Sequence, residues 1–214
     1  MPKLPVIFLD EEPLATYMRE YGNGWDSKDY ELAVAIWLKR ALDNLKKKSH
    51  CIAFELKAEL SKCVPYFNAQ DPSHVRQVLQ ECRSEGAYDA FIVEGTAAQH
   101  RETGWAFQFK RLIGKNVVNP NFLGGLVDYI KGMTRKYADS ESAFVVIPEP
   151  DREFVLLPND RERLHAKMSE TLPTSFPFKK VLIMGKTSDD NVSFTEIWPS
   201  LFTMETARED SHVH

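Results

Sequence analysis

The chain contains few cysteines and no long hydrophobic run. Its 214 residues include three cysteines, Cys51, Cys63 and Cys82. An odd number of cysteines in a chain of this length does not form a disulfide framework, and no CxxC pair suggests structural zinc. No apolar run approaches the roughly 20 residues that a membrane span needs. The N-terminal segment becomes acidic at Asp10, too early for a secretory signal. We therefore expect reduced thiols, a cytoplasmic location and no membrane partner.

Several common catalytic signatures are also missing. The sequence has no GxGxxG, GxxxxGK[ST], GxSxG or HExxH motif. Nucleotide-binding, α/β-hydrolase and zinc-protease interpretations therefore lack the residues that would support them. An overall excess of positive charge is absent as well, because the formal net charge is −4. The chain as a whole is not a basic nucleic-acid binder.

Positive charge is nevertheless concentrated in one part of the chain. Between residues 101 and 136, seven lysines and arginines face two acids, which gives 7 − 2 = +5. A further basic run, Lys46 to Lys48, ends the first long helical pattern. Basic segments of this kind often form a solvated face, but they also suit a polyanionic substrate. Four of these residues are the candidates for contacts with nucleic acid: Lys47, Arg101, Arg111 and Lys115.

Apolar periodicity predicts an α/β chain. We expect helices at 30–47, 73–84, 119–137 and 159–172, and strands at 51–60, 88–95, 105–113, 142–150, 179–186 and 192–198. Residues 95–104 form a polar connection, and 153–158 form a short strand or an extended segment. Strands close together in sequence pair antiparallel, while strands separated by helices tend to be parallel. The pattern predicts a mixed central sheet flanked by helices, in a single domain over 1–214.

Two consecutive strands carry the most unusual polar residues. Alternation within 105–113 places Gln108 and Lys110 on one face and bulky aromatic residues on the other. Two hydrophilic residues side by side on so apolar a strand break the local pattern, and such violations often mark functional sites. Asp89 begins the preceding strand. If the two strands form a hairpin, a carboxylate, an amide and an ammonium group lie at one end of the sheet.

This combination of groups has a chemical use. A carboxylate oxygen and an amide carbonyl are hard ligands that suit Mg²⁺, which takes its remaining ligands from water and substrate phosphate. A bound metal acidifies water and neutralises charge on the scissile phosphate. A lysine on the same face can orient the attacking water or stabilise the transition state. The spacing Gln-x-Lys matters because it keeps both side chains on one face.

Asp89 followed by Gln108-Phe109-Lys110-Arg111 resembles the signature of the PD-(D/E)xK nucleases, in the variant where Gln replaces the second acid. The resemblance is greatest to the Mrr-like restriction endonucleases. That family's early helix carries a Glu that completes the metal site, and Tyr30 to Val34 resembles it, with Glu31 in that position. The resemblance implies a restriction-endonuclease-like core, αβββαβ, over about 30–147.

The sequence departs from the family's pattern in two places. The helix expected at 73–84 is an insertion between the first and second core strands, and Tyr88 stands where the motif has Pro. Residues 148–214 form a C-terminal extension outside the resemblance. A second Glu-x-Lys, Glu55-Leu56-Lys57, lacks an acidic strand before it, and we interpret it as a decoy.

The resemblance implies a metal-dependent endonuclease that cleaves phosphodiester bonds in DNA, in a defence or restriction role. The implied cofactor is Mg²⁺ or Mn²⁺, held by Asp89, Gln108 and Glu31, with Lys110 as a further catalytic residue. A homo-oligomer or a partner subunit is left open. The alternatives are a catalytically silent nuclease-fold module that binds nucleic acid or protein, and an unrelated α/β protein in which Gln108 and Lys110 face solvent.

Overall fold

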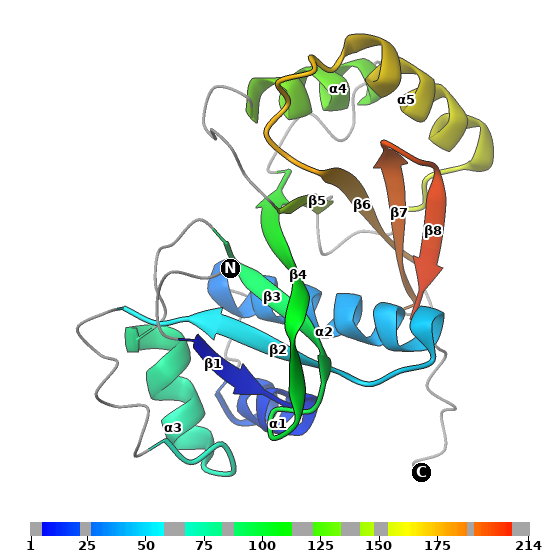
Figure 1. Ribbon diagram of the computed structural model, residues 1–214. Coiled ribbons are helices and arrows are strands. Elements are labelled where there is room, and N and C mark those ends of the chain that lie inside the picture. The colour runs from blue at the N-terminus through cyan, green and yellow to red at the C-terminus, as the bar shows by residue number, and fades with distance from the viewer. Residues whose placement is uncertain are drawn as a thin grey trace. The chain divides into compact units, whose positions relative to one another are not determined.

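The computed structural model describes residues 6–21, 27–57, 67–82, 88–112, 122–133, 142–147, 154–187 and 191–206. The chain divides into two compact units, Met1–Phe107 and Gln108–His214, and each is described by itself (Figure 1). Division into compact units does not define independent folding, so the single domain expected over 1–214 stays a prediction. None of the described helices is both long and apolar enough to cross a membrane.

The first unit contains an antiparallel meander of strands in chain order. Its strands are β1 (Val6–Leu9), β2 (His50–Glu55), β3 (Ala90–Gly95) and the first part of β4 (His100–Arg111). Its helices are α1 (Glu11–Tyr21), α2 (Ser27–Lys46) and α3 (Pro72–Gln77), and a π-helical turn, η2 (Val78–Cys82), follows α3. Asp71 caps α3, its carboxylate accepting the backbone N–H of Ser73 at 2.9 Å.

The two faces of β2 pack against different parts of the first unit. His50 hydrogen-bonds to Asp43 of α2 and shares its face of the strand with Ile52 and Phe54, so α2 covers that face. On the opposite face, Cys51 and Ala53 of β2 cluster with Phe91 and Val93 of β3. Ala106 of β4 and two β1 residues, Val6 and Phe8, pack against the same cluster. Tyr88 packs against these residues as well, and we call this set the small cluster.

The turn between β3 and β4 depends on Gly95. Its φ is 114°, and a Cβ there would clash with the backbone carbonyl of Gln99 and lie 2.8 Å from the Cα of His100. We expect Gly95→Ala to destabilise the protein by about 1–3 kcal/mol, because it adds both a strained φ and a backbone clash. Urea unfolding would measure the loss.

Gly125 provides the matched control for this substitution. It lies inside α4 (Phe122–Gly132), and a Cβ there meets no atom within 4 Å. Gly125→Ala should leave stability unchanged or raise it by up to about 1 kcal/mol, since alanine favours a helix over glycine. Equal stability of Gly95→Ala and wild type would mean that the turn can adopt another conformation.

The second unit mixes parallel and antiparallel strands. β5 (Ala143–Ile147) pairs in parallel with β6 (Lys180–Lys186), and β7 (Val192–Trp198) and β8 (Phe202–Glu205) follow antiparallel. Just beyond the end of β4, the backbone N–H of Leu112 donates to the carbonyl of Ile147 at 2.8 Å. Helix α4 packs beside α5 (Pro158–Thr171), which also packs on β7 (Figure 1). Their apolar residues share one core with β5, β6 and β7.

The structure confirms the mixed α/β class and most of the expected elements. The described order α2, β2, α3, β3, β4, α4, β5 matches the order expected over 30–147, with the inserted helix in place. A restriction-endonuclease-like core remains a prediction. The main corrections concern lengths: β2 ends at Glu55, β3 starts at Ala90, and β4 starts at His100 inside the expected connection.

Several other expectations need correction. The helix expected at 73–84 is α-helical only as far as Gln77 and then widens into a π-helical turn. The segment 153–158 forms no strand in its described part; Phe154 makes one isolated bridge to Lys186. Three elements were not foreseen, namely β1, α1 and β8. Residues 58–60 and both ends of the expected helix 119–137 lie outside the described residues.

Candidate functional site

Asp89 lies one residue before β3, at the end of the sheet of the first unit. Its backbone N–H donates to the carbonyl of Phe107 in β4 at 2.9 Å, and Ala90 is also paired with Phe107, so Asp89 and Ala90 both lie against one β4 residue, as in a β-bulge. Its side chain is half-buried. The expected hairpin between the two strands is confirmed, and it brings Asp89 beside the part of β4 that immediately precedes Gln108.

Gln108 and Lys110 follow on β4 at alternate positions. Gln108 is 4% exposed and therefore buried, whereas Lys110 is half-buried. Strand alternation puts both on the same face as Ala106, the β4 residue that packs against the small cluster. Phe107 and Phe109, on the other face, are buried apolar residues, as expected. The convergence of the Gln108 and Lys110 side chains with Asp89 stays a prediction.

Glu31 lies in the first part of α2 and is half-buried. Because α2 covers the His50 face of β2, Glu31 comes from the layer opposite the small cluster. Its approach to Asp89 therefore stays a prediction.

Glu55, the last residue of β2, is a buried acid at the same end of the sheet. It pairs with Val6 of β1, and it lies two residues beyond Ala53, whose partner in β3 is Phe91. It is 8% exposed. Burial raises the pKa of its carboxyl group above the ordinary 4.5. The sequence analysis set this residue aside as part of a decoy motif.

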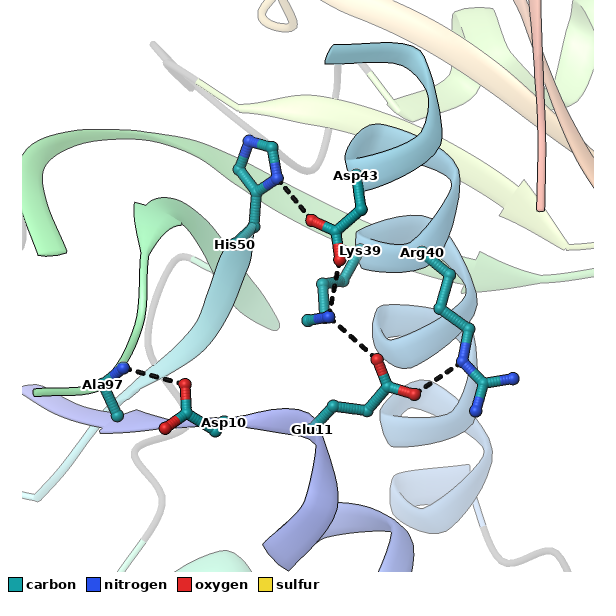
Figure 2. A network of polar contacts seen from close by, with 7 residues as sticks. All are labelled: Asp10, Glu11, Lys39, Arg40, Asp43, His50 and Ala97. Carbon is teal, nitrogen blue, oxygen red and sulfur yellow. Dashed lines mark hydrogen bonds and ion pairs between the residues drawn. The ribbon is translucent and has the colours of Figure 1, made fainter. Parts of the chain in front are cut away.

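A chain of charged residues joins α1, α2 and β2 (Figure 2). Lys39 donates to Glu11 at 2.8 Å and to Asp43 at 2.7 Å, and Asp43 also bonds to His50 Nδ1 at 2.6 Å. Arg40 binds the other oxygen of Glu11 at 2.6 Å. In the same view, Asp10 accepts the backbone N–H of Ala97 at 2.9 Å. This charged network holds α1, α2 and the sheet together, and we assign it a structural role.

The pKa values in the charged network follow from its pairing. Burial alone would raise the pKa of Glu11, but hydrogen bonds from Lys39 and Arg40 outweigh it and hold the pKa below 4.5. Burial alone would lower the pKa of Lys39, but its two carboxylate partners hold it above 10.5. Both side chains therefore carry full charge over the neutral range.

The candidate phosphate-binding residues have different surroundings. Arg101 is exposed and lies 3.3 Å from Glu94, which also binds Lys48 at 3.0 Å. Hydrogen bonding from Lys48 lowers the pKa of Glu94. Glu94 thus offsets one cation of the 101–136 segment, Arg101, and one of the run Lys46 to Lys48, Lys48. Lys47 is exposed and bonds to Asn44, Arg111 is half-buried, and Lys115 lies outside the described residues.

Cys51 and the metal-ligating side chains bear on two other kinds of site, a thiol nucleophile and a metal centre of His, Cys, Asp and Glu. Cys51 is a buried free thiol, and burial, with the charge of Asp10, raises its pKa to about 11. A buried thiol with a raised pKa is a poor nucleophile at neutral pH. Within the described ranges, no three His, Cys, Asp or Glu side chains gather closely enough to hold a metal. The metal ligands predicted from the sequence are two carboxylates, Asp89 and Glu31, and one amide, Gln108. A set that includes an amide falls outside this finding.

Comparison with protein families, with curated proteins and with solved structures gives no match to this chain. The candidate site therefore rests on its own residues. Sequence reasoning missed Glu55 as a member of this end of the sheet. The available signal was its position: the strand alternation that places Cys51 and Ala53 inward continues to Glu55.

Proposed function

We propose that this protein is a metal-dependent nuclease that cleaves phosphodiester bonds in DNA. One observation carries the proposal: Asp89 is bonded through its backbone to β4 at Phe107, immediately before Gln108-Phe109-Lys110. The PD-(D/E)xK signature requires an acid and a Gln-x-Lys on two adjacent strands, and the hairpin supplies that adjacency. A role in defence or restriction follows from the resemblance to the Mrr-like endonucleases.

The donor set at this end of the sheet fits a hard divalent cation. Asp89 and the amide of Gln108 would provide oxygen ligands, with Glu31 as a further candidate. When bound by these residues, Mg²⁺ or Mn²⁺ would acidify a water molecule and neutralise charge on the scissile phosphate. Lys110 orients the attacking water and stabilises the negative charge of the transition state.

Binding to DNA should depend strongly on salt, because the proposed contacts are lysines and arginines that release counterions from phosphates. Lys47, Arg101, Arg111 and Lys115 are the proposed contacts. We expect affinity for a DNA duplex, measured by fluorescence anisotropy with Ca²⁺ in place of Mg²⁺, to fall steeply with rising salt. Glu94→Gln should strengthen binding at low salt, since it releases Arg101 and Lys48 from their shared carboxylate. Affinity that is flat with salt would favour the silent-module alternative.

The direct test is cleavage of a supercoiled plasmid by the full chain. We expect nicking with Mg²⁺ and with Mn²⁺, and no nicking when a chelator removes the metal. A single-stranded RNA substrate, assayed in parallel, separates DNA from RNA specificity. A folded wild-type protein that binds DNA without cleaving it in either metal would identify a catalytically silent nuclease-fold module.

A further inference from the structure

Trp105 of β4 presents part of its side chain to solvent. It is 37% exposed, whereas the other Phe, Tyr and Trp residues in the described part of the first unit are buried or half-buried. Its ring centroid lies 5.6 Å from that of His50, at an interplanar angle of 51°. His50 is buried, and its Nδ1 bonds to Asp43 of α2 at 2.6 Å (Figure 2). Because this neighbour is fixed, the indole loses little freedom when a ligand binds.

Cations gather beside this aromatic side chain. Glu94 of β3 pairs with His50 in the β2–β3 register. One carboxylate oxygen of Glu94 binds both Lys48, at 3.0 Å, and Arg101, at 3.3 Å. The side chains of Lys48 and Arg101 are 51% and 68% exposed, so both remain accessible to a ligand. Two more exposed lysines immediately precede Lys48. An exposed aromatic side chain and several cations thus lie in the same part of the first unit.

Lys47 has a backbone conformation that favours other residue types. Its φ is 52°, in the left-handed region, and it is the first residue after α2. Glycine or asparagine commonly occupies this position, because a Cβ makes the left-handed conformation less favourable. A lysine there costs some stability while it adds a positive charge to the surface. Such a departure from the local rule points to a role for the charge.

We propose that these side chains bind unpaired nucleotides, with a base stacked on Trp105 and backbone phosphates on the cations. Proteins that bind single strands combine aromatic side chains, on which bases stack, with cations that follow the phosphates. The inference rests on the proposed function for the class of ligand, a nucleic acid, and adds Trp105 and a preference for unpaired bases. We call Lys46, Lys47, Lys48, Arg101 and Trp105 the aromatic-basic surface.

The test compares a single strand with a duplex of the same length, in a chelator that prevents cleavage. Affinity of the full chain for a labelled oligothymidylate and for the duplex is measured by fluorescence anisotropy. Trp105→Leu keeps an apolar side chain but removes the ring. It should weaken single-strand binding by about 5- to 150-fold, the equivalent of one stacked base. Duplex affinity should stay unchanged, since paired bases already stack on one another. An oligouridylate, assayed in parallel, separates DNA from RNA as the bound strand.

Two variants serve as controls for the loss of the ring. Phe202→Leu removes a 41% exposed aromatic side chain from β8 in the second unit and should leave single-strand affinity unchanged. Trp105→Phe keeps an aromatic face and should weaken binding less than Trp105→Leu. If circular dichroism shows that Trp105→Leu does not fold, ultraviolet crosslinking of wild type to an iodouracil-substituted strand replaces it. The crosslinked peptide, identified by mass spectrometry, should contain Trp105.

Lys47→Gly separates the charge of this residue from its structural role. Glycine relieves the positive φ, so the unfolding temperature should equal or exceed that of wild type. The slope of log affinity against log salt for the single strand should nevertheless decrease by about 0.7, the contribution of one phosphate contact. An unchanged slope would remove Lys47 from the aromatic-basic surface.

The outcomes separate this inference from the nuclease function. Equal single-strand affinity of wild type and folded Trp105→Leu overturns the inference and leaves the nuclease standing. Equal weakening of single-strand and duplex binding also overturns it, because a stacked unpaired base would affect only the single strand. Selective loss of single-strand binding in Trp105→Leu, with no plasmid cleavage by wild type, supports the aromatic-basic surface and overturns the nuclease.

Discussion

Lys110→Ala should lose about 10²–10⁴-fold in the rate of DNA cleavage, the range expected when a positioned proton-transfer group is removed. Lys110 is half-buried on β4, two residues after Gln108 and on the same face. In the proposed mechanism its ammonium group acts on the attacking water and the transition state. One ammonium among several basic residues adds little to ground-state binding, so most DNA affinity should survive.

The matched control is Lys131→Ala, which removes the same charge from an exposed position on α4. It should reduce DNA affinity slightly and leave the single-turnover cleavage rate unchanged. Circular dichroism would establish that both variants retain the fold. Equal cleavage by wild type and Lys110→Ala would mean that another site or a contaminant is responsible, and the assignment to Lys110 would be withdrawn.

Two further variants distinguish the roles within the same site. Asp89→Asn should lose both cleavage and divalent-metal affinity, because it removes the proposed carboxylate ligand just before β3. Gln108→Glu should be milder, since it restores the acid that is commoner in the PD-(D/E)xK signature and adds a negative ligand. A Gln108→Glu variant as inactive as Asp89→Asn would indicate that the amide donates a hydrogen bond that an acid cannot replace.

Lys39→Met should lower the free energy of unfolding by about 3 kcal/mol, the lower end of the range for breaking a buried ion pair. Lys39 is 8% exposed and binds two carboxylates that are 24% and 27% exposed in their side chains. Methionine fills similar space but leaves both acids without that cation. Their partial exposure to water moderates the loss, because solvent screens the charges that remain.

The effect of Lys39→Met should depend on pH in a defined direction. The pKa of Glu11 is lowered in the folded protein, so its charge stabilises the fold above about 4.5, and this contribution is lost as the pH falls. The pKa of Lys39 is raised, so its contribution is complete below 10.5 and is lost as the pH rises past its folded pKa. The difference in the free energy of unfolding between wild type and variant should therefore narrow below pH 4.5, where the stabilising charge of Glu11 is lost.

Urea unfolding at neutral pH and below pH 4.5 would measure this gap. The control is Lys46→Met, which changes an exposed lysine at the end of the same helix and should alter stability by no more than about 0.5 kcal/mol. A Lys39→Met variant as stable as wild type at neutral pH would contradict this prediction. It would show that Arg40 and His50 are enough to stabilise the buried carboxylates of Glu11 and Asp43.

The sequence predicted those helices and strands that show a clear apolar period over consecutive residues. Helix α2 was expected from apolar spacing over 30–47, and the structure has it at Ser27–Lys46. The hairpin of β3 and β4 followed from two apolar strands near each other in sequence. β1 was missed because its four residues are too few to show a period, and β8 for the same reason.

Some features of the candidate site likewise follow from the sequence, whereas others depend on the tertiary structure. The sequence alone determined that Gln108 and Lys110 share a face, because that depends only on the two-residue period of a strand. It also predicted Asp89 at the beginning of the first strand of the hairpin, and the structure starts β3 one residue later, at Ala90. Tertiary structure alone decided that Glu55 is buried at this end of the sheet, since its position depends on pairing with β1 and β3. Tertiary structure also decided that Lys39 joins Glu11, 28 residues away, to Asp43, because periodicity carries no information about which distant charge fills a buried position.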